Sequence, residues 1–222
     1  MKPSARPSIR GVAFDLDGLL VNTEDLYQDV GTELLRRRGR TFEPELLDRM
    51  MGRPQQVSLQ IMIDWHGLTD TIEALARETG EIFFSLLDTR LEPMPGAVAL
   101  VESLARRGLP RGVATSSGPD FAHDVLSRVG LRDRFGFVLT SADVTQGKPH
   151  PEIYERAAVR LGVVPSDMLV FEDSENGCRA AVAAGALVVA VPGAHSRRHD
   201  FTGARFVAES LADPRIGALL ST

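Results

Sequence analysis

The chain has 222 residues, of which 43% are hydrophobic and 25% charged, and its formal net charge is −5. This composition is ordinary for a globular protein, and the length allows one large domain or a core with a smaller appendage. The acidic balance gives no reason to expect a nucleic acid polymer or an anionic membrane as partner. Cys178 is the single cysteine, which excludes an internal disulfide and suits a reducing compartment.

Neither a targeting segment nor a membrane span is predicted. Residues 1–10 contain prolines and basic residues but no apolar core, so they do not resemble a secretory signal. The longest apolar run, 180–191, is interrupted by Gly185 and is shorter than the roughly 20 residues of a membrane-spanning helix. We therefore expect a cytoplasmic enzyme.

The first predicted strand covers about 10–15 and leads directly into two acids. Asp15 and Asp17 are spaced i and i+2, and Gly18 follows them. Strand side chains repeat with a period of two, so a continued strand would place both carboxylates on one face, whereas Gly18 indicates that the backbone turns. Two acids after an apolar strand suggest a functional site. The alternative, a strand end followed by an ordinary Asp-Gly turn, stays open at this point.

A helical segment follows. Asn22 or Thr23 can cap a helix that runs to about Arg38. Residues 43–92 carry apolar side chains at helical spacing and show no convincing strand. We predict that 19–92 form a helical subdomain inserted after the first strand, and that 1–18 together with 93–222 form the core.

From residue 96 onward, predicted helices and strands alternate. The strands are expected near 112–115, 137–140, 168–171, 187–191 and 206–207. Helices of about ten residues separate most of them, which is the pattern of a parallel sheet. The predicted fold class is α/β, with a Rossmann-like parallel sheet flanked by helices and an inserted helical subdomain.

Polar residues follow three of these strands and should meet at one edge of the sheet. They are Asp15 and Asp17, then Thr115 with Ser116, then Glu172 with Asp173, and Lys148 precedes a helix that Pro151 begins. Four carboxylates in one cleft require a cation, and an all-oxygen ligand set suits Mg²⁺. A carboxylate nucleophile, a second acid, Mg²⁺ and a lysine are the components of phosphoryl transfer through an aspartyl-phosphate.

These segments resemble the four motifs of the haloacid-dehalogenase-like superfamily, in the order found there and across about residues 10–193. They are Asp15-Leu16-Asp17-Gly18, the strand that ends in Thr115, Lys148-Pro149 and Glu172-Asp173. The helical insert is similar to the cap of the β-phosphoglucomutase-like phosphatases.

The resemblance implies a role for each matching position. Asp15 would be the nucleophile and Asp17 the general acid and base. Thr115, the Ser116 amide and Lys148 would hold the phosphate. Mg²⁺ would be bound by the Asp15 carboxylate, the Asp17 main-chain carbonyl and Asp173, with support from Glu172. An acid at position 17 also argues against dehalogenation.

The substrate is less well defined by the sequence. Tyr27 occupies the position of a cap histidine found in the mutase, and the spacing of its substrate-binding arginine reaches Gln55, with Arg53 two residues earlier. The cap is therefore more similar to that of sugar-phosphate and nucleotide monophosphatases. Arg53 and Gln55 are candidate substrate contacts, and an exposed cap loop is an equally good interpretation of them.

We expect a Mg²⁺-dependent phosphatase of small phosphorylated metabolites, such as sugar phosphates or nucleoside monophosphates, acting as a monomer or weak dimer. The alternative enzyme is a β-phosphoglucomutase that interconverts β-glucose 1-phosphate and glucose 6-phosphate. A non-catalytic receiver-type domain fits less well, because it needs about half this length and has no helical insert.

Overall fold

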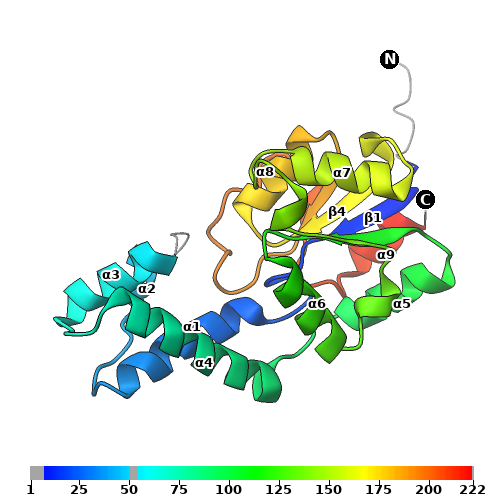
Figure 1. Ribbon diagram of the computed structural model, residues 1–222. Coiled ribbons are helices and arrows are strands. Elements are labelled where there is room, and N and C mark those ends of the chain that lie inside the picture. The colour runs from blue at the N-terminus through cyan, green and yellow to red at the C-terminus, as the bar shows by residue number, and fades with distance from the viewer. Residues whose placement is uncertain (1–7, 51–54, 222) are drawn as a thin grey trace. The chain divides into compact units, whose positions relative to one another are not determined.

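A computed structural model describes residues 8–50 and 55–221 (Figure 1). The chain divides into two compact units. Unit 1 comprises Met1–Asn22 and Glu92–Thr222, and unit 2 comprises Thr23–Leu91.

Unit 1 is built on a six-stranded sheet in which every pair of neighbouring strands is parallel. The order across the sheet is β3-β2-β1-β4-β5-β6. The strands are β1 (Gly11–Phe14), β2 (Arg111–Ala114), β3 (Val138–Leu139), β4 (Met168–Glu172), β5 (Leu187–Ala190) and β6 (Phe206–Val207). The prediction of a Rossmann-like parallel sheet is confirmed.

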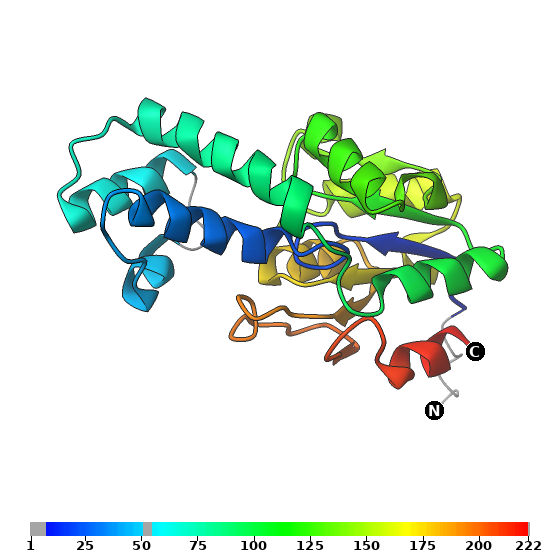
Figure 2. The same ribbon diagram turned by 90° about the horizontal axis from the view of Figure 1, so that it is seen from below.

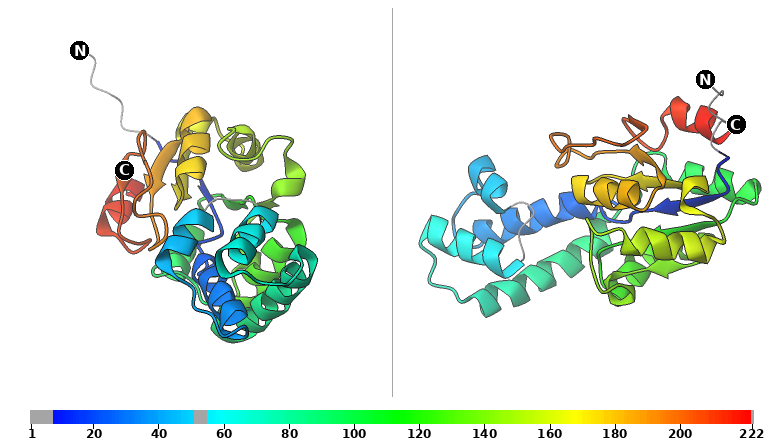
Figure 3. Two further views of the ribbon diagram at one scale, coloured as in Figure 1. Left: turned by 90° about the vertical axis from the view of Figure 1, so that its left-hand side faces the viewer. Right: turned by 90° about the horizontal axis from the view of Figure 1, so that it is seen from above.

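Helices cover both faces of this sheet. They are α5 (Ala97–Arg106), α6 (Pro119–Arg128), α7 (Glu152–Leu161), α8 (Glu175–Ala183) and α9 (Pro214–Leu220). Figure 1 shows α7 and α8 over one face and α5 and α6 over the other, and the right-hand view of Figure 3 shows α7 and α8 side by side. Figure 2 looks onto the side that carries α5 and α9, where Arg107 Nη2 donates to the Leu220 carbonyl at 2.8 Å. Helix α9 has no counterpart among the elements predicted from the sequence.

The central strands are buried on both faces, which explains why their sequences are continuously apolar rather than alternating. On one face the Phe14 ring stacks on Phe171 at 5.1 Å between centroids and meets Phe135 edge-on at 5.8 Å. On the other face Ala13 and Val170 pack in one cluster with side chains of α7 and α8. The burial of both faces fixes β1 and β4 beside each other.

Unit 2 contains four described helices. They are α1 (Thr23–Arg36), α2 (Pro44–Met50), α3 (Gln55–His66) and α4 (Ile72–Arg90). Helices α1 and α4 pack on each other, and the Tyr27 and Phe83 rings stack at 4.5 Å between centroids. Arg38, which follows α1, ties that segment to α4 and to the residues before it. Its Nη2 lies 2.7 Å from both Asp70 Oδ1 and Glu78 Oε2.

Within residues 8–50 and 55–221, none of the helices combines the length and the apolar character that crossing a membrane requires.

Candidate functional site

The site lies at the point where the order of strand addition in the sheet reverses. The chain adds β2 and β3 on one side of β1 and then crosses to add β4, β5 and β6 on the other side. Crevices at such switch points, beyond the carboxyl ends of parallel strands, are the usual ligand sites of this architecture. Asp15 directly follows β1, and Asp173 directly follows β4. The Asp15 amide donates to the Phe171 carbonyl at 3.0 Å, which ties the two strand ends together.

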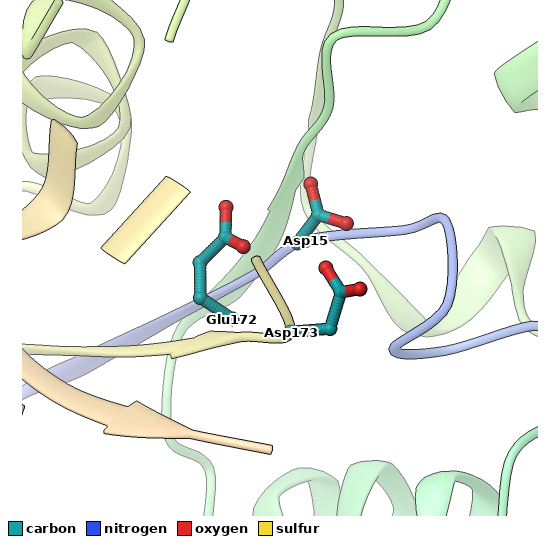
Figure 4. Close-up of side chains that lie close together, drawn as sticks. All are labelled: Asp15, Glu172 and Asp173. Carbon is teal, nitrogen blue, oxygen red and sulfur yellow. The ribbon is translucent and has the colours of Figure 1, made fainter. Parts of the chain in front are cut away.

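Three carboxylates gather at this edge (Figure 4). Asp15, Glu172 and Asp173 each offer an oxygen, and the three ligand atoms lie within 4.8 Å of one another. Their residues are only 6%, 0% and 8% exposed. Three negative charges held this close away from water need a compensating cation. An all-oxygen donor set with no histidine or thiolate fits Mg²⁺.

Lys148 supplies one positive charge to this cluster. Its Nζ donates to Asp15 Oδ1 at 2.5 Å, to Glu172 Oε1 at 2.6 Å and to the Ala114 carbonyl at 3.0 Å. Burial acts to lower the pKa of Lys148, but the charges of Asp15 and Glu172 outweigh it and raise that pKa. The lysine is therefore a fixed cation.

The surroundings of the Asp15 carboxyl disfavour its ionised form. Burial raises its pKa well above the usual range, the charges of Glu172 and Asp17 raise it further, and Lys148 acts in the opposite direction. Added positive charge at this edge would therefore favour the ionised form of Asp15.

Glu172 is held by protein donors on both oxygens. The Tyr154 hydroxyl donates to Oε1 at 2.7 Å, while the Ser174 amide and hydroxyl donate to Oε2 at 3.2 and 3.0 Å. The Ser174 hydroxyl also accepts from the Gly177 amide at 3.1 Å and so caps α8. Glu172 is thus anchored simultaneously to α7, α8 and Lys148.

Asp17 lies in the loop after β1 and has a different set of partners. The loop turns at Gly18, whose φ of 72° favours glycine, and the Gly18 amide donates to the Val21 carbonyl at 2.9 Å. Asp17 Oδ2 accepts from Ser117 Oγ at 2.7 Å and from Thr115 Oγ1 at 3.1 Å. Its carboxylate is therefore oriented by the loop that follows β2.

The comparisons with known proteins agree with this geometry. Residues 12–191 match the model of the haloacid dehalogenase-like hydrolases. The chain belongs to this family.

Among the haloacid dehalogenase-like relatives, a probable pseudouridine-5'-phosphatase of Drosophila melanogaster is 37% identical, covering 90% of this chain and 89% of the relative. A phosphorylated carbohydrates phosphatase of Thermotoga maritima is 32% identical, over 80% and 82%. The bifunctional riboflavin kinase/FMN phosphatase of Arabidopsis thaliana is 31% identical, and the match spans 92% of this chain but only 54% of that longer protein. The crystal structure of a putative beta-phosphoglucomutase from Thermotoga maritima superimposes with a TM-score of 0.82 at 28% identity, covering 96% of this chain and 97% of that one.

The haloacid dehalogenase-like motifs meet in unit 1, but not every predicted residue lies there. Lys148 contacts Asp15 and Glu172, and Asp173 lies in the same cluster. Thr115 donates to Asp17, whose charge acts on Asp15. Ser116 follows Thr115 and is exposed. Gln55 begins α3 in unit 2 and is exposed, and Arg53 lies outside the described residues.

Two residues of the site were not among the predicted ones. Ser117 donates to Asp17, and Tyr154 donates to Glu172. Ser117 stands in the polar run after β2, which is a usable signal. Tyr154 follows Lys148 by six residues on a helix, and its polar contact cannot be distinguished in the sequence from ordinary helix packing.

Proposed function

We propose that this chain is a Mg²⁺-dependent phosphatase that hydrolyses small phosphorylated metabolites through an aspartyl-phosphate. One observation carries the proposal: Asp15, Glu172, Asp173 and Lys148 form one buried cluster at the carboxyl edge of the sheet. A carboxylate there can act as a nucleophile only if cations offset the charge of its neighbours and of an incoming phosphate.

In this proposal an Asp15 oxygen attacks the phosphorus of the substrate while the bond from phosphorus to the ester oxygen breaks. Asp17 gives its proton to the leaving oxygen, so that an alcohol departs and an aspartyl-phosphate remains. Asp17, now a carboxylate, takes a proton from water, and the resulting hydroxide attacks the phosphorus. Inorganic phosphate leaves, and both aspartates return to their starting forms. Ser117 orients Asp17 for both proton transfers.

Mg²⁺ would be held by the carboxylates of Asp15 and Asp173 and by the main-chain carbonyl of Asp17, and it would offset negative charge on the phosphate. Glu172 supports this set by fixing Lys148, whose Nζ bridges Glu172 and Asp15. Lys148, the Thr115 hydroxyl and the Ser116 amide would bind the phosphate oxygens.

Unit 2 would act as the cap that selects the organic part of the substrate, with Arg53 and Gln55 as candidate contacts. The names of the relatives support two substrate classes, since one is a probable pseudouridine-5'-phosphatase and another acts on phosphorylated carbohydrates. We infer that the natural substrate is a sugar phosphate or a nucleoside monophosphate.

The test measures phosphate release from a panel of sugar phosphates and nucleoside monophosphates, with Mg²⁺ and with EDTA. Asp15→Asn should lower release by more than about a thousandfold. Asp124→Asn is the matched control, because Asp124 pairs with Arg128 on the exposed surface of α6 and should leave release unchanged. Phosphate release that is unchanged in Asp15→Asn, or unchanged in the presence of EDTA, would refute the mechanism.

A second candidate is a β-phosphoglucomutase, which the likeness to the putative Thermotoga maritima enzyme favours. Tyr27 weakens this alternative, because it stacks on Phe83 within unit 2 at the position of the cap histidine of the mutase. The same assay decides: interconversion of β-glucose 1-phosphate and glucose 6-phosphate without phosphate release would establish the mutase.

A further inference from the structure

A second polar cavity lies in unit 1, at the opposite edge of the sheet from the carboxylate cluster. Its volume is about 380 Å³, and its lining includes Arg111, Arg134 and Arg160. Arg111 begins β2, whereas Ala114, the acceptor of Lys148, ends it. The two ends of this strand are separated by about 10 Å at the usual rise per residue. We call this cavity the amino-edge pocket.

Within residues 8–50 and 55–221, no acidic side chain forms an ion pair with the arginines of the pocket. Nη1 of Arg111 donates to the Leu109 carbonyl at 3.1 Å, but its buried Nε has no hydrogen-bond partner in the part of the chain that the structure describes. Over the same residues, neither Arg134 nor Arg160 forms an ion pair. Asp133 is the single carboxylate in the described lining, and it is exposed. The lining therefore carries a formal excess of positive charge.

The surroundings of Arg111 contrast with those of Arg38, another partly buried arginine. Arg38 is bound by two carboxylates, as expected for a partly buried cation. Arg111 instead has its pKa lowered by burial and by the charge of Arg134. A buried guanidinium donor without a partner costs free energy that an incoming acceptor would recover. An anion is the kind of ligand that could supply such an acceptor to the Arg111 guanidinium.

The other lining residues and the volume of the pocket indicate which kind of anion it could hold. Phe135 and Phe137 also line the cavity, so one wall is apolar while the guanidinium groups supply forked donors. Such forks match the paired oxygens of phosphates and carboxylates, and the volume is in the range of small-molecule sites. We propose that the amino-edge pocket binds a small organic phosphate, with the partly buried Arg111 as its anchor, independently of the carboxylate cluster.

The probe for the test is phenylphosphonate, which carries a phosphonate on an aromatic ring and has no ester bond to hydrolyse. It is titrated in EDTA while amide resonances are followed by ¹H–¹⁵N NMR. Gly108 and Gly136 report on the amino-edge pocket, and Gly18 and Ser117 report on the carboxylate cluster. We expect saturable shifts at Gly108 and Gly136. Inorganic phosphate is titrated in parallel, and it should bind the pocket more weakly if the apolar wall contacts the organic part.

Two variants and one control locate the binding. Arg111→Met and the exposed Arg160→Met should each weaken the response at Gly136 by about tenfold or more, since each removes a charge-assisted donor. Shifts at Gly18 should not change. Arg132→Met is the matched control, because Arg132 belongs to the same short helical turn as Arg134 but donates to His123 at 2.7 Å outside the lining. The absence of pocket shifts at millimolar probe, or equal affinity in both pocket variants and wild type, would overturn the proposal.

Discussion

The backbone of Gly177 passes directly against the carboxylate of Glu172. A Cβ atom at position 177 would lie 1.7 Å from Glu172 Oε1, far closer than two non-bonded atoms can approach. Glycine at this position of α8 is therefore required by the acid that holds Lys148 and Tyr154.

Gly177→Ala should displace Glu172 and disturb the whole cluster. We expect a loss of about 1–3 kcal/mol in the free energy of unfolding, which is typical of overpacking, together with slower phosphate release. Gly80→Ala is the control, because Gly80 lies in α4 with no atom near the added Cβ and alanine favours a helix by about 0.5–1 kcal/mol. Urea denaturation of both variants measures the difference. Equal stability of the two would contradict the packing argument.

Lys148→Met should make the cluster more dependent on a divalent cation. It removes the charge between Asp15 and Glu172, and breaking a buried ion pair costs about 3 kcal/mol or more. The melting temperature in EDTA should therefore fall, and Mg²⁺ should raise it more than in the wild type. Phosphate release should decline by about 10²- to 10³-fold. Arg156→Met, which removes an exposed cation of α7, should show neither effect. An equal Mg²⁺ response in Lys148→Met and wild type would contradict the shared-charge argument.

The substitutions Ser117→Ala and Ser116→Ala distinguish the roles of two neighbouring serines. Ser117 Oγ donates to Asp17 at 2.7 Å, whereas the Ser116 side chain is exposed and only its amide is proposed to bind phosphate. We expect Ser117→Ala to lower kcat by about tenfold, since the loss of one hydrogen bond leaves Asp17 less well oriented. Ser116→Ala should stay near the wild-type value. Steady-state kinetics on the best substrate of the panel tests this prediction. A larger loss of kcat in Ser116→Ala than in Ser117→Ala would contradict the role assigned to Ser117.

The arginines of unit 2 predict an acid-sensitive contribution to stability. Hydrogen bonds from Arg36 and Arg37 lower the pKa of Glu33 to about 2, and Arg38 lowers the pKa values of Asp70 and Glu78. These carboxyl groups have lower pKa values in the folded state than in the unfolded state. Their contribution is therefore present above the unfolded value, about 4, and disappears as the pH falls through the folded values.

Arg38→Met should accordingly destabilise the protein at pH 7 and lose this effect as the pH falls through the lowered pKa values of Asp70 and Glu78. Arg38 contacts both Asp70 and Glu78, while Arg40 is exposed and serves as the control position for Arg40→Met. Denaturation followed by circular dichroism at several pH values gives the comparison. A destabilisation that is independent of pH would assign the role of Arg38 to packing instead.

The convergence of Asp15 and Glu172 was predictable because it depends on the topology. Apolar runs of strand length identified β1 and β4, and a parallel sheet brings the residues after such strands to one edge. The detailed position of each side chain was not needed for this inference. The sheet prediction is confirmed, and Lys148 Nζ contacts both Asp15 and Glu172.

The partners of Glu172 and the amino-edge pocket were not predictable in the same way. Tyr154 shares the inner face of α7 with apolar residues, and only the packing of that helix turns its hydroxyl toward Glu172. Arg111, Arg134 and Arg160 are separated by more than twenty residues each and follow no local pattern. Their common lining arises from the meeting of three element ends, which no periodicity in the sequence encodes.

The two crossings between the units have a consequence for how the protein can be altered. The Asn22 amide donates to the Glu92 carbonyl at 3.1 Å, and the Glu92 amide donates to Asn22 Oδ1 at 2.9 Å. The chain thus leaves unit 1 and returns to it at neighbouring points, so a short peptide could close the gap without disturbing the sheet. The path of the chain through unit 1 is therefore compatible with a different insert in place of Thr23–Leu91. Under the proposed function, such a replacement would change the range of accepted substrates while the carboxylate cluster stays intact.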